Sequence, residues 1–243
     1  TTKETNKETY KFKVKVVGVD TPITIKEKVS TSVTGIASQV LPTLTFNVDD
    51  SGLYTITHAK DSTLQIGATE SVTEYRYRGA SPKNYVTFNN EVWRIIGVFP
   101  TDDGTGNIEN RIKLIKDQSI GNKYWDTSES NNWARPATLN TELNTTYLNS
   151  LDSTSKSMIG NTKYYLGGKV PTWEDNGYAD TPLQFYSYER KTQNTTSNEF
   201  YYESNPNSWV GKLGIMYLSD YGYASSNCEN KRIYDKNSSS NDI

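Results

Sequence analysis

A β-hairpin constrains the fold of this chain more than any other segment of the sequence. Its strands are predicted at Tyr85–Phe88 and Val92–Phe99, because both runs are rich in β-branched and aromatic residues. The intervening Asn89-Asn90 suits a tight turn, since asparagine tolerates positive φ angles. After a cluster of Gly, Asp and Asn residues, the alternating run Arg111–Lys116 predicts a third strand. An antiparallel meander with one buried face is typical of a scaffold and indicates no catalytic chemistry.

The chain is long enough, at 243 residues, to bury a hydrophobic core, and we interpret it as two domains. Residues 1–10 are polar and lack periodicity, which predicts a flexible leader. Residues 11–71 contain several short strand-like runs separated by Pro and Asp-Ser-Gly, so they are expected to form an N-terminal β-rich domain. The second domain is expected to span residues 72–243.

Two helices are predicted in this second domain, which makes the predicted fold class α+β. The first runs from Pro136 to about Leu151, where apolar residues recur at spacings of three and four. Its apolar face consists of Leu139, Leu143, Tyr147, Leu148 and Leu151. The second helix is predicted over residues 153–159, with Ser153 as its cap and Met158 facing inward. Residues 161–202 are predicted to be a long loop, and Trp209–Tyr217 a buried strand.

Composition excludes several classes of partner. The 26 basic and 28 acidic residues nearly balance, so nucleic acid is not an expected partner. No apolar run approaches the roughly 20 residues that a membrane-spanning helix needs. Cys228 is the sole cysteine, which excludes an intrachain disulfide and a multi-cysteine zinc site. The 18 Tyr residues and the abundant Asn, Ser and Thr are typical of an extracellular, β-rich protein.

The sequence contains no recognisable catalytic motif, and the protein is predicted not to be an enzyme. His58, the single histidine, lies in a polar stretch and is predicted to be a surface residue with no partner for a metal site. No Gly-x-Ser-x-Gly elbow is present. A glycosidase needs only two carboxylates at a suitable separation, and several acidic residues of the long loop could supply them. These are Glu174, Asp175, Asp180, Glu189, Glu199 and Glu203.

No cofactor and no metal are predicted, although one loop leaves the question of calcium open. Asp102–Glu109 places several oxygen ligands around two glycines, as a calcium loop would. It lacks the Asp-x-Asp-x-Asp-Gly spacing of an EF-hand, so an ordinary hairpin loop is the favoured interpretation.

The long loop also contains the predicted ligand-binding residues. Aromatic rings alternate there with Asn and Asp, a combination suited to contacts with sugars or proteins, although rings of this kind also pack the loops of a fold. The predicted ligand-binding residues are Trp173, Tyr178, Tyr186, Tyr188, Tyr201 and Tyr202. By contrast, Trp93, Trp125 and Trp133 are assigned to the core, because they lie in or beside predicted regular elements.

Several blocks of the sequence resemble a family of surface proteins from Gram-positive gut bacteria. They are YRYRGASPKNYVTFNNEVWRIIGVF, IKLIKDQSIGNKYWDT, NNWARPATLNTELNTTYLNSL, SMIGNTKYYLGG and WVGKLGIMYLSDYGYASSNCEN, which together cover roughly residues 75–230. The family is similar in organisation to the C-type-lectin-like fold of formylglycine-generating enzymes. Some of its members resemble prepilins. The resemblance implies that residues 72–243 form a C-type-lectin-like domain with an antiparallel sheet.

The resemblance also implies a function. It implies an exported, extracellular, non-catalytic protein of the cell surface, an adhesin whose partner is a glycan or a surface protein. A structural subunit of a pilus or fibre, assembled by pairing of sheet edges, is the alternative, and a glycan-active hydrolase is the third hypothesis. In the family the domain continues into further strands after the last block, so we expect residues 72–243 to form an incomplete domain. Any ligand site that those strands line is expected to be incomplete as well.

Overall fold

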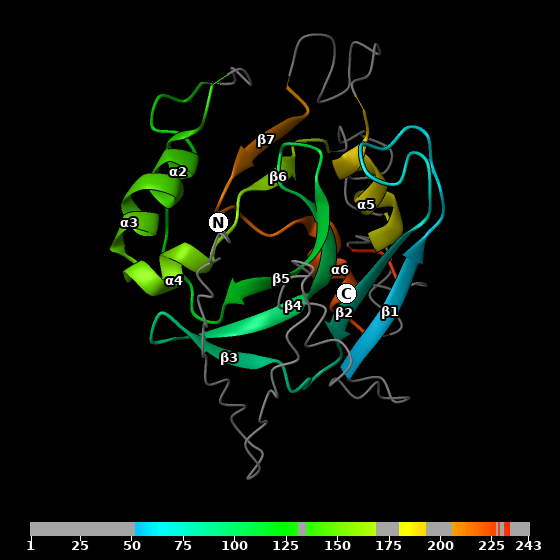
Figure 1. The fold of residues 1–243 in the computed structure, drawn as a ribbon, viewed down its shortest axis with the longest axis horizontal. Coiled ribbons are helices and arrows are strands. Elements are labelled where there is room, and N and C mark those ends of the chain that lie inside the picture. Colours follow the sequence, from blue (N-terminus) through cyan, green and yellow to red (C-terminus); the bar gives the residue numbers. More distant parts are fainter. Residues whose placement is uncertain are drawn as a thin grey trace, which may run out of the picture.

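Antiparallel strands and short helices make up the fold, which is α+β as predicted (Figure 1). The computed structural model describes residues 52–130, 135–168, 180–192 and 206–226, together with Cys228 and residues 231–233. The predicted leader and most of the predicted N-terminal domain therefore lie outside the described residues.

The larger sheet is built around one long central strand. β1 (Gly52–His58), β2 (Val72–Arg78), β4 (Glu91–Asp102) and β3 (Tyr85–Phe88) follow one another across the sheet, and β5 (Ile108–Lys116) also pairs with β4. β3 pairs with the first residues of β4 and β2 with residues near its middle, while β5 covers most of the opposite edge. The predicted meander of three strands is confirmed.

The two turns of the meander have the conformations that their Asn, Asp and Gly residues favour. Asn89 and Asn90 have φ angles of 53° and 58°, the left-handed values that a two-residue hairpin turn requires. In the next turn, Asp102 Oδ1 accepts hydrogen bonds from the backbone N–H groups of Gly104 and Gly106. The carboxylate of Asp102 therefore stabilises a hairpin loop.

The predicted domain boundary between residues 71 and 72 is wrong, because the strand before it, β1, belongs to the same sheet as the strands after it. β1 pairs with β2 along all its residues, from Gly52 opposite Arg78 to His58 opposite Val72. The two strands share one sheet, and the sheet continues into β4. Residues 52–58 therefore belong to the same folding unit as the strands that follow. The sequence shows a polar, small-residue segment before Ser71, but this segment is a connection within the sheet.

The first predicted helix is confirmed, with shorter bounds. It begins as α2 (Thr138–Thr141), continues through the π-helical turn η2 (Glu142–Tyr147) and ends as α3 (Leu148–Ser150). The second predicted helix is α4 (Ser153–Met158). Its cap is Asp152 and not Ser153, because the Asp152 side chain accepts a hydrogen bond from the Ser155 N–H. Met158 is exposed and does not face inward.

Regular structure also occurs in the predicted long loop. β6 (Thr162–Tyr165) pairs with β7 (Ser208–Gly211) to form a second, two-stranded sheet. Helix α5 (Pro182–Arg190) begins with a capping box formed by Thr181 and Gln184, a start signal that the sequence contained. The predicted strand Trp209–Tyr217 ends at Gly211, and helix α6 (Leu218–Tyr223) follows.

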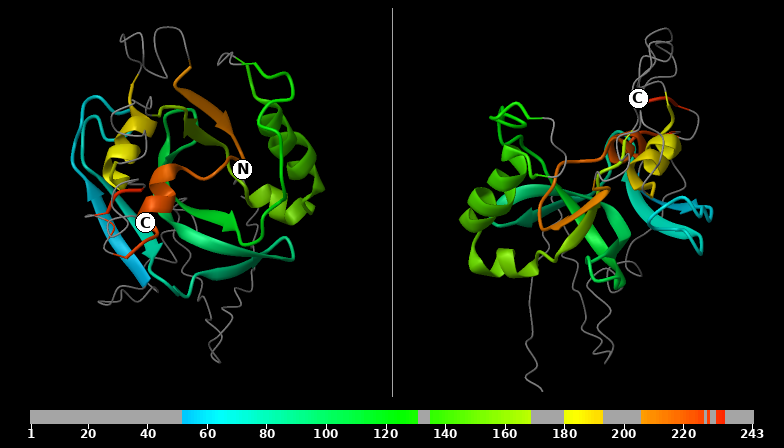
Figure 2. Two further views of the ribbon diagram at one scale, coloured as in Figure 1. Left: turned by 180° about the vertical axis from the view of Figure 1, so that it is seen from behind. Right: turned by 90° about the horizontal axis from the view of Figure 1, so that it is seen from above.

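The described helices lie in two groups at opposite sides of the molecule. Seen from above, α2–α4 lie at one side and α5 and α6 at the other, close to β1 and β2 (Figure 2). One buried cluster lies on the second side, where Leu64, Tyr186, Tyr223 and Cys228 pack together. A second cluster of Ile66, Val72 and Tyr165 adjoins β2 and β6.

Candidate functional site

Buried charges gather between β2 and helices α5 and α6. Alternation along the paired strands β1 and β2 places His58, Glu74 and Arg76 on one face of the sheet, since opposed residues of an antiparallel pair share a face. Helix α5 contributes Glu189 and Arg190, α6 contributes Ser219 and Asp220, and β5 contributes Lys113. We call these eight side chains the charge cluster.

Arg76 is the centre of one half of the charge cluster. Its Nε lies 2.8 Å from Glu74 Oε2 and its Nη1 lies 2.8 Å from Asp220 Oδ1. Burial by itself would raise the pKa of Glu74, but the charge of Arg76 and the hydrogen bond with His58 outweigh it and lower the pKa to about 2. The pKa of Asp220 is likewise lowered despite its burial, because Lys113 and Arg76 both bind its carboxylate.

Glu189 is the centre of the other half. Its carboxylate accepts hydrogen bonds from the Ser219 N–H at 2.9 Å and from the Ser219 hydroxyl at 2.5 Å, while Arg190 Nη1 lies 2.7 Å away. Burial nevertheless dominates and raises the pKa of Glu189. The Arg190 guanidinium also stacks over the Tyr186 ring, 3.8 Å from its centroid.

The prediction that His58 is a surface residue is wrong. His58 is 4% exposed, its ring stacks on that of Tyr186 at 3.6 Å, and its Nε2 lies 3.2 Å from Glu74 Oε2. The alternation of β1 gave a signal, since His58 is in phase with Ile56, which packs against the core. No pattern in β1 could show the partner ring, because Tyr186 lies more than a hundred residues further along the chain.

The charge cluster is balanced in charge and, apart from Lys113, buried. Three carboxylates face two guanidinium groups and one ammonium group, and all the members except Lys113 are 5% exposed or less. A catalytic acid or base must come within hydrogen-bonding distance of a substrate, and these groups are covered by protein. Their contacts instead join β2 and β5 to α6, and α5 to α6. The arrangement is therefore suited to holding the elements together.

Tyr186 does not lie at a ligand-binding surface. It is 1% exposed and belongs to the core, so its assignment as a ligand-binding residue is wrong. Tyr188, on the same helix, is partly exposed and packs edge-on against Phe185. The remaining predicted ligand-binding residues, Trp173, Tyr178, Tyr201 and Tyr202, lie outside the described residues. Among the proposed glycosidase carboxylates, Glu189 is buried in the charge cluster, and Asp180 is partly buried.

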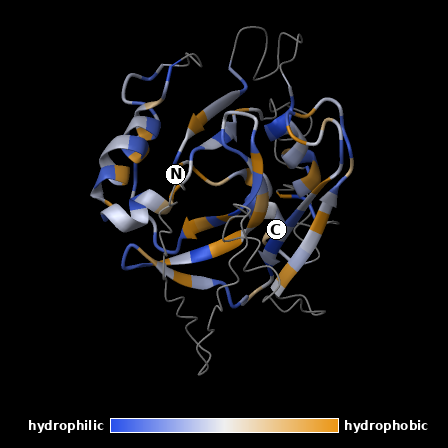
Figure 3. Ribbon diagram, in the orientation of Figure 1, coloured by the Kyte–Doolittle hydropathy of each residue, from blue (hydrophilic) through white to orange (hydrophobic). Residues whose placement is uncertain are grey.

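A large open groove is lined by strands β4 and β5 and by the continuous helix formed by α2, η2 and α3. Ile95, Ile112 and Leu114 lie on one face of the sheet by their register, and the helix adds Leu143 and Tyr147. The segment between β7 and α6 contributes further apolar residues, namely Leu213, Ile215 and Met216. Figure 3 shows the apolar residues on β4, β5 and β7. The groove encloses about 1750 Å³, well above the roughly 300–1,000 Å³ of small-molecule pockets.

One edge of the groove is β5, an edge strand among the strands that the structure describes. Among the described strands, β5 pairs with β4 alone. Lys116 at its end binds Glu91, and Tyr147 Oη lies 3.2 Å from the same carboxylate, so the polar groups at this end are paired with one another. The groove thus combines a mainly apolar lining with a strand that, among the described strands, stands at the edge of its sheet.

The loop between β5 and α2 exposes two aromatic rings. Tyr124 is 80% and Trp125 60% exposed, so the assignment of Trp125 to the core is wrong. Trp93, in contrast, is buried as predicted and packs edge-on against Phe88. Trp133 lies outside the described residues. Position next to a regular element therefore did not determine burial at Trp125.

Within the described residues, no three His, Cys, Asp or Glu side chains are grouped so that they could hold a metal ion. In the loop considered for calcium, Asp103 Oδ1 accepts hydrogen bonds from Thr105, and Glu109 Oε1 accepts one from Arg111. No helix in the described part of the chain is long and apolar enough to cross a bilayer.

Comparison with models of known families, with curated proteins and with solved structures gave no match.

Proposed function

We propose that this chain is an extracellular protein of the cell surface that binds a ligand without catalysing a reaction. The observation that supports this proposal best is the open groove between the β4–β5 face and the α2–α3 helix. Most of the ionisable groups of the charge cluster are buried and paired with one another, whereas the groove has a mainly apolar lining that Glu74, Lys113 and Arg190 border. The resemblance to Gram-positive surface proteins with a C-type-lectin-like domain is part of the same proposal.

The groove suits an extended segment of a protein partner. Its size favours a polypeptide over a metabolite. A partner strand could pair with β5 and place alternate side chains against Ile112 and Leu114. Main-chain hydrogen bonds would then supply affinity, and the apolar lining would supply specificity.

A binding panel with two matched variants tests this proposal. The protein is applied to immobilised host and bacterial surface proteins, and the affinities of Leu143→Lys and Leu183→Lys are compared with that of the parent. Leu143 lines the groove, whereas Leu183 is an exposed residue of α5 that does not. We expect Leu143→Lys to weaken binding at least about tenfold, since a charge placed in an apolar contact must be desolvated. Leu183→Lys should bind as the parent does. A panel without any bound protein, or equal loss in both variants, contradicts the proposal.

A fibre subunit is the second candidate, because β5 could pair with a strand of another copy. Light scattering over about a hundredfold range of concentration tests this alternative. Growth of the particle mass with concentration supports the fibre, and a constant monomer mass excludes strand pairing between copies under these conditions. Release of reducing ends from a glycan panel would instead support the third candidate, a glycan-active hydrolase.

A further inference from the structure

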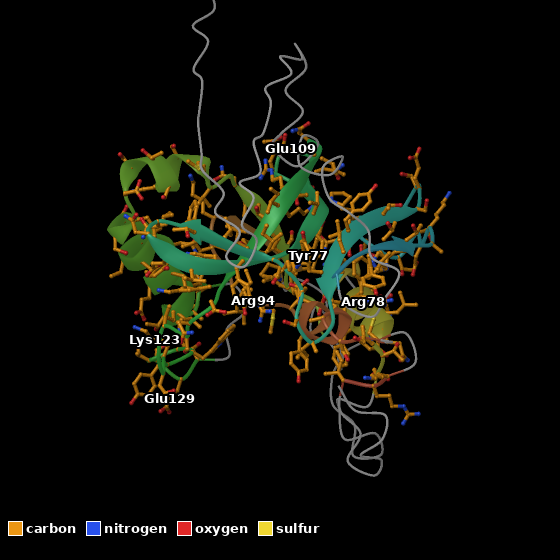
Figure 4. The ribbon with its side chains drawn as sticks, turned by 90° about the horizontal axis from the view of Figure 1, so that it is seen from below. Tyr77, Arg78, Arg94, Glu109, Lys123 and Glu129 are labelled. Atoms are coloured by element: carbon orange, nitrogen blue, oxygen red, sulfur yellow. The ribbon has the colours of Figure 1, made fainter. Side chains whose placement is uncertain are left out.

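The loop of residues 117–130 holds two exposed aromatic side chains next to residues 118–123, which line the groove. Tyr124 and Trp125 are exposed, and neither lines the groove. Lys123 and Glu129 lie on this loop, which extends beyond the sheet (Figure 4). Single exposed apolar residues are common, but two neighbouring aromatic rings that expose most of their surface need an explanation.

Hydrogen bonds fix the backbone that bears these rings. The Trp125 carbonyl accepts a hydrogen bond from the Leu139 N–H, and the Thr127 N–H donates to Thr138 Oγ1, both at 3.1 Å. Asp126 Oδ1 accepts from the Ser128 N–H and hydroxyl and from Thr138 Oγ1, and its pKa is lowered chiefly by the Ser128 backbone hydrogen bond. The loop is thereby tied to the first turn of α2. Two rigid rings presented on a fixed backbone lose little conformational entropy on binding.

We propose that Tyr124 and Trp125 form a binding platform for a neutral glycan. A pyranose ring has an apolar face of C–H groups, which can stack on an aromatic ring, and a rim of hydroxyl groups. Hydrogen-bonding groups for such a rim are available on the same loop, in the exposed side chains of Asn122 and Gln118. The two charged residues that directly flank the rings in the chain are paired, Lys123 with Glu142 and Asp126 with Arg135. This pairing favours an uncharged ligand.

The small apolar area argues against a protein as the occupant. Stable protein interfaces bury about 800 Å² on each partner around an apolar centre. Ile120 is the one other large hydrophobic residue of this loop, and the remaining residues of the loop are polar or glycine. One or two sugar rings match an area of this size.

The inference names a second ligand class at two rings that border the groove without lining it, and it rests on the proposed function in that both require a surface-binding protein. The full chain is tested on an array of neutral oligosaccharides, and the best ligand is then titrated by calorimetry. Trp125→Ala and Tyr124→Ala should each weaken binding at least about tenfold, and the double variant should abolish it. Tyr221→Ala is the matched control, because Tyr221 is an exposed tyrosine of α6, and it should bind as the parent does.

Melting temperature, salt dependence and the array result together distinguish loss of the glycan site from unfolding or from ionic binding. Melting temperatures of Trp125→Ala and Tyr124→Ala should equal that of the parent, so a loss of binding does not reflect unfolding. Binding should be nearly constant between about 50 and 500 mM salt, because a neutral ligand makes no ion pair. An array without a bound neutral glycan, or unchanged binding by the double variant, overturns the platform. Since Leu143→Lys alters only the groove, loss of protein binding in that variant alone leaves the platform intact.

Discussion

Replacement of Arg76 by methionine tests the structural role of the charge cluster most directly. Arg76 is 1% exposed and binds both Glu74 and Asp220, and its guanidinium also lies over the rings of Phe99 and Tyr223. Methionine preserves much of the apolar volume but removes the charge. Three carboxylates would then face only Arg190 and Lys113.

The expected loss is large because the remaining carboxylates stay buried. Removal of one partner of a buried ion pair destabilises proteins by about 3–5 kcal/mol, since an uncompensated charge is left without water. For a chain of this size, such a loss lowers the melting temperature by roughly 6–20 °C. The loss should shrink as the pH falls from 7 towards 3. Without Arg76 the pKa of Glu74 rises, so less of the variant's stability depends on an ionised Glu74.

Urea unfolding followed by circular dichroism measures these differences, with Lys116→Met as the matched control. Lys116 also forms an ion pair, with Glu91, but both side chains are partly exposed. Exposed pairs contribute at most about 1 kcal/mol, so this control should lose little stability. If Arg76→Met loses no more stability than Lys116→Met, or if its loss does not depend on pH, the charge cluster does not hold the elements together as we infer.

Three further predictions follow from the same structure. Trp93→Ala should lower the free energy of unfolding by about 3–5 kcal/mol, whereas the exposed Trp125→Ala should change it by less than about 0.5 kcal/mol; equal urea midpoints for the two variants would contradict the assigned burial. Gly97→Ala should cost about 3 kcal/mol, because its Cβ would lie 2.1 Å from the Tyr75 carbonyl oxygen, while Gly106→Ala meets no neighbouring atom and should cost about 1 kcal/mol of backbone strain. Stability should decrease as the pH falls from about 4.5 to 2, because Glu74 and Asp220 have lowered pKa values in the folded state and the unfolded chain binds more protons. Glu74→Gln should flatten this decrease in acid titrations, and an unchanged slope would show that Glu74 is not its source.

Short-range patterns in the sequence determined much of the local structure. Asn89-Asn90 predicts its turn because the φ angles of two adjacent residues decide the geometry of a tight hairpin. The spacing of Leu139 and Leu143 predicts a helix from Pro136 to about Leu151, which the structure has at residues 138–150, because both period and apolar face are properties of one continuous segment. The burial of Trp93 likewise follows from its place in a central strand. Each of these features depends on residues close together in the chain.

The tertiary structure alone decided which polar residues are buried and which aromatic residues are exposed. His58 lies in a polar stretch, yet its ring stacks on Tyr186, and ionised Glu74 is stabilised by Arg76 from β2 and Arg190 from α5. Tyr186 was predicted at a binding surface but is buried, because α5 packs on the core. Trp125 was predicted in the core but is exposed, because the loop before α2 extends away from it. Burial and pKa depend on neighbours that are distant in sequence. Their identity follows only from how β1, β2, α5 and α6 pack together.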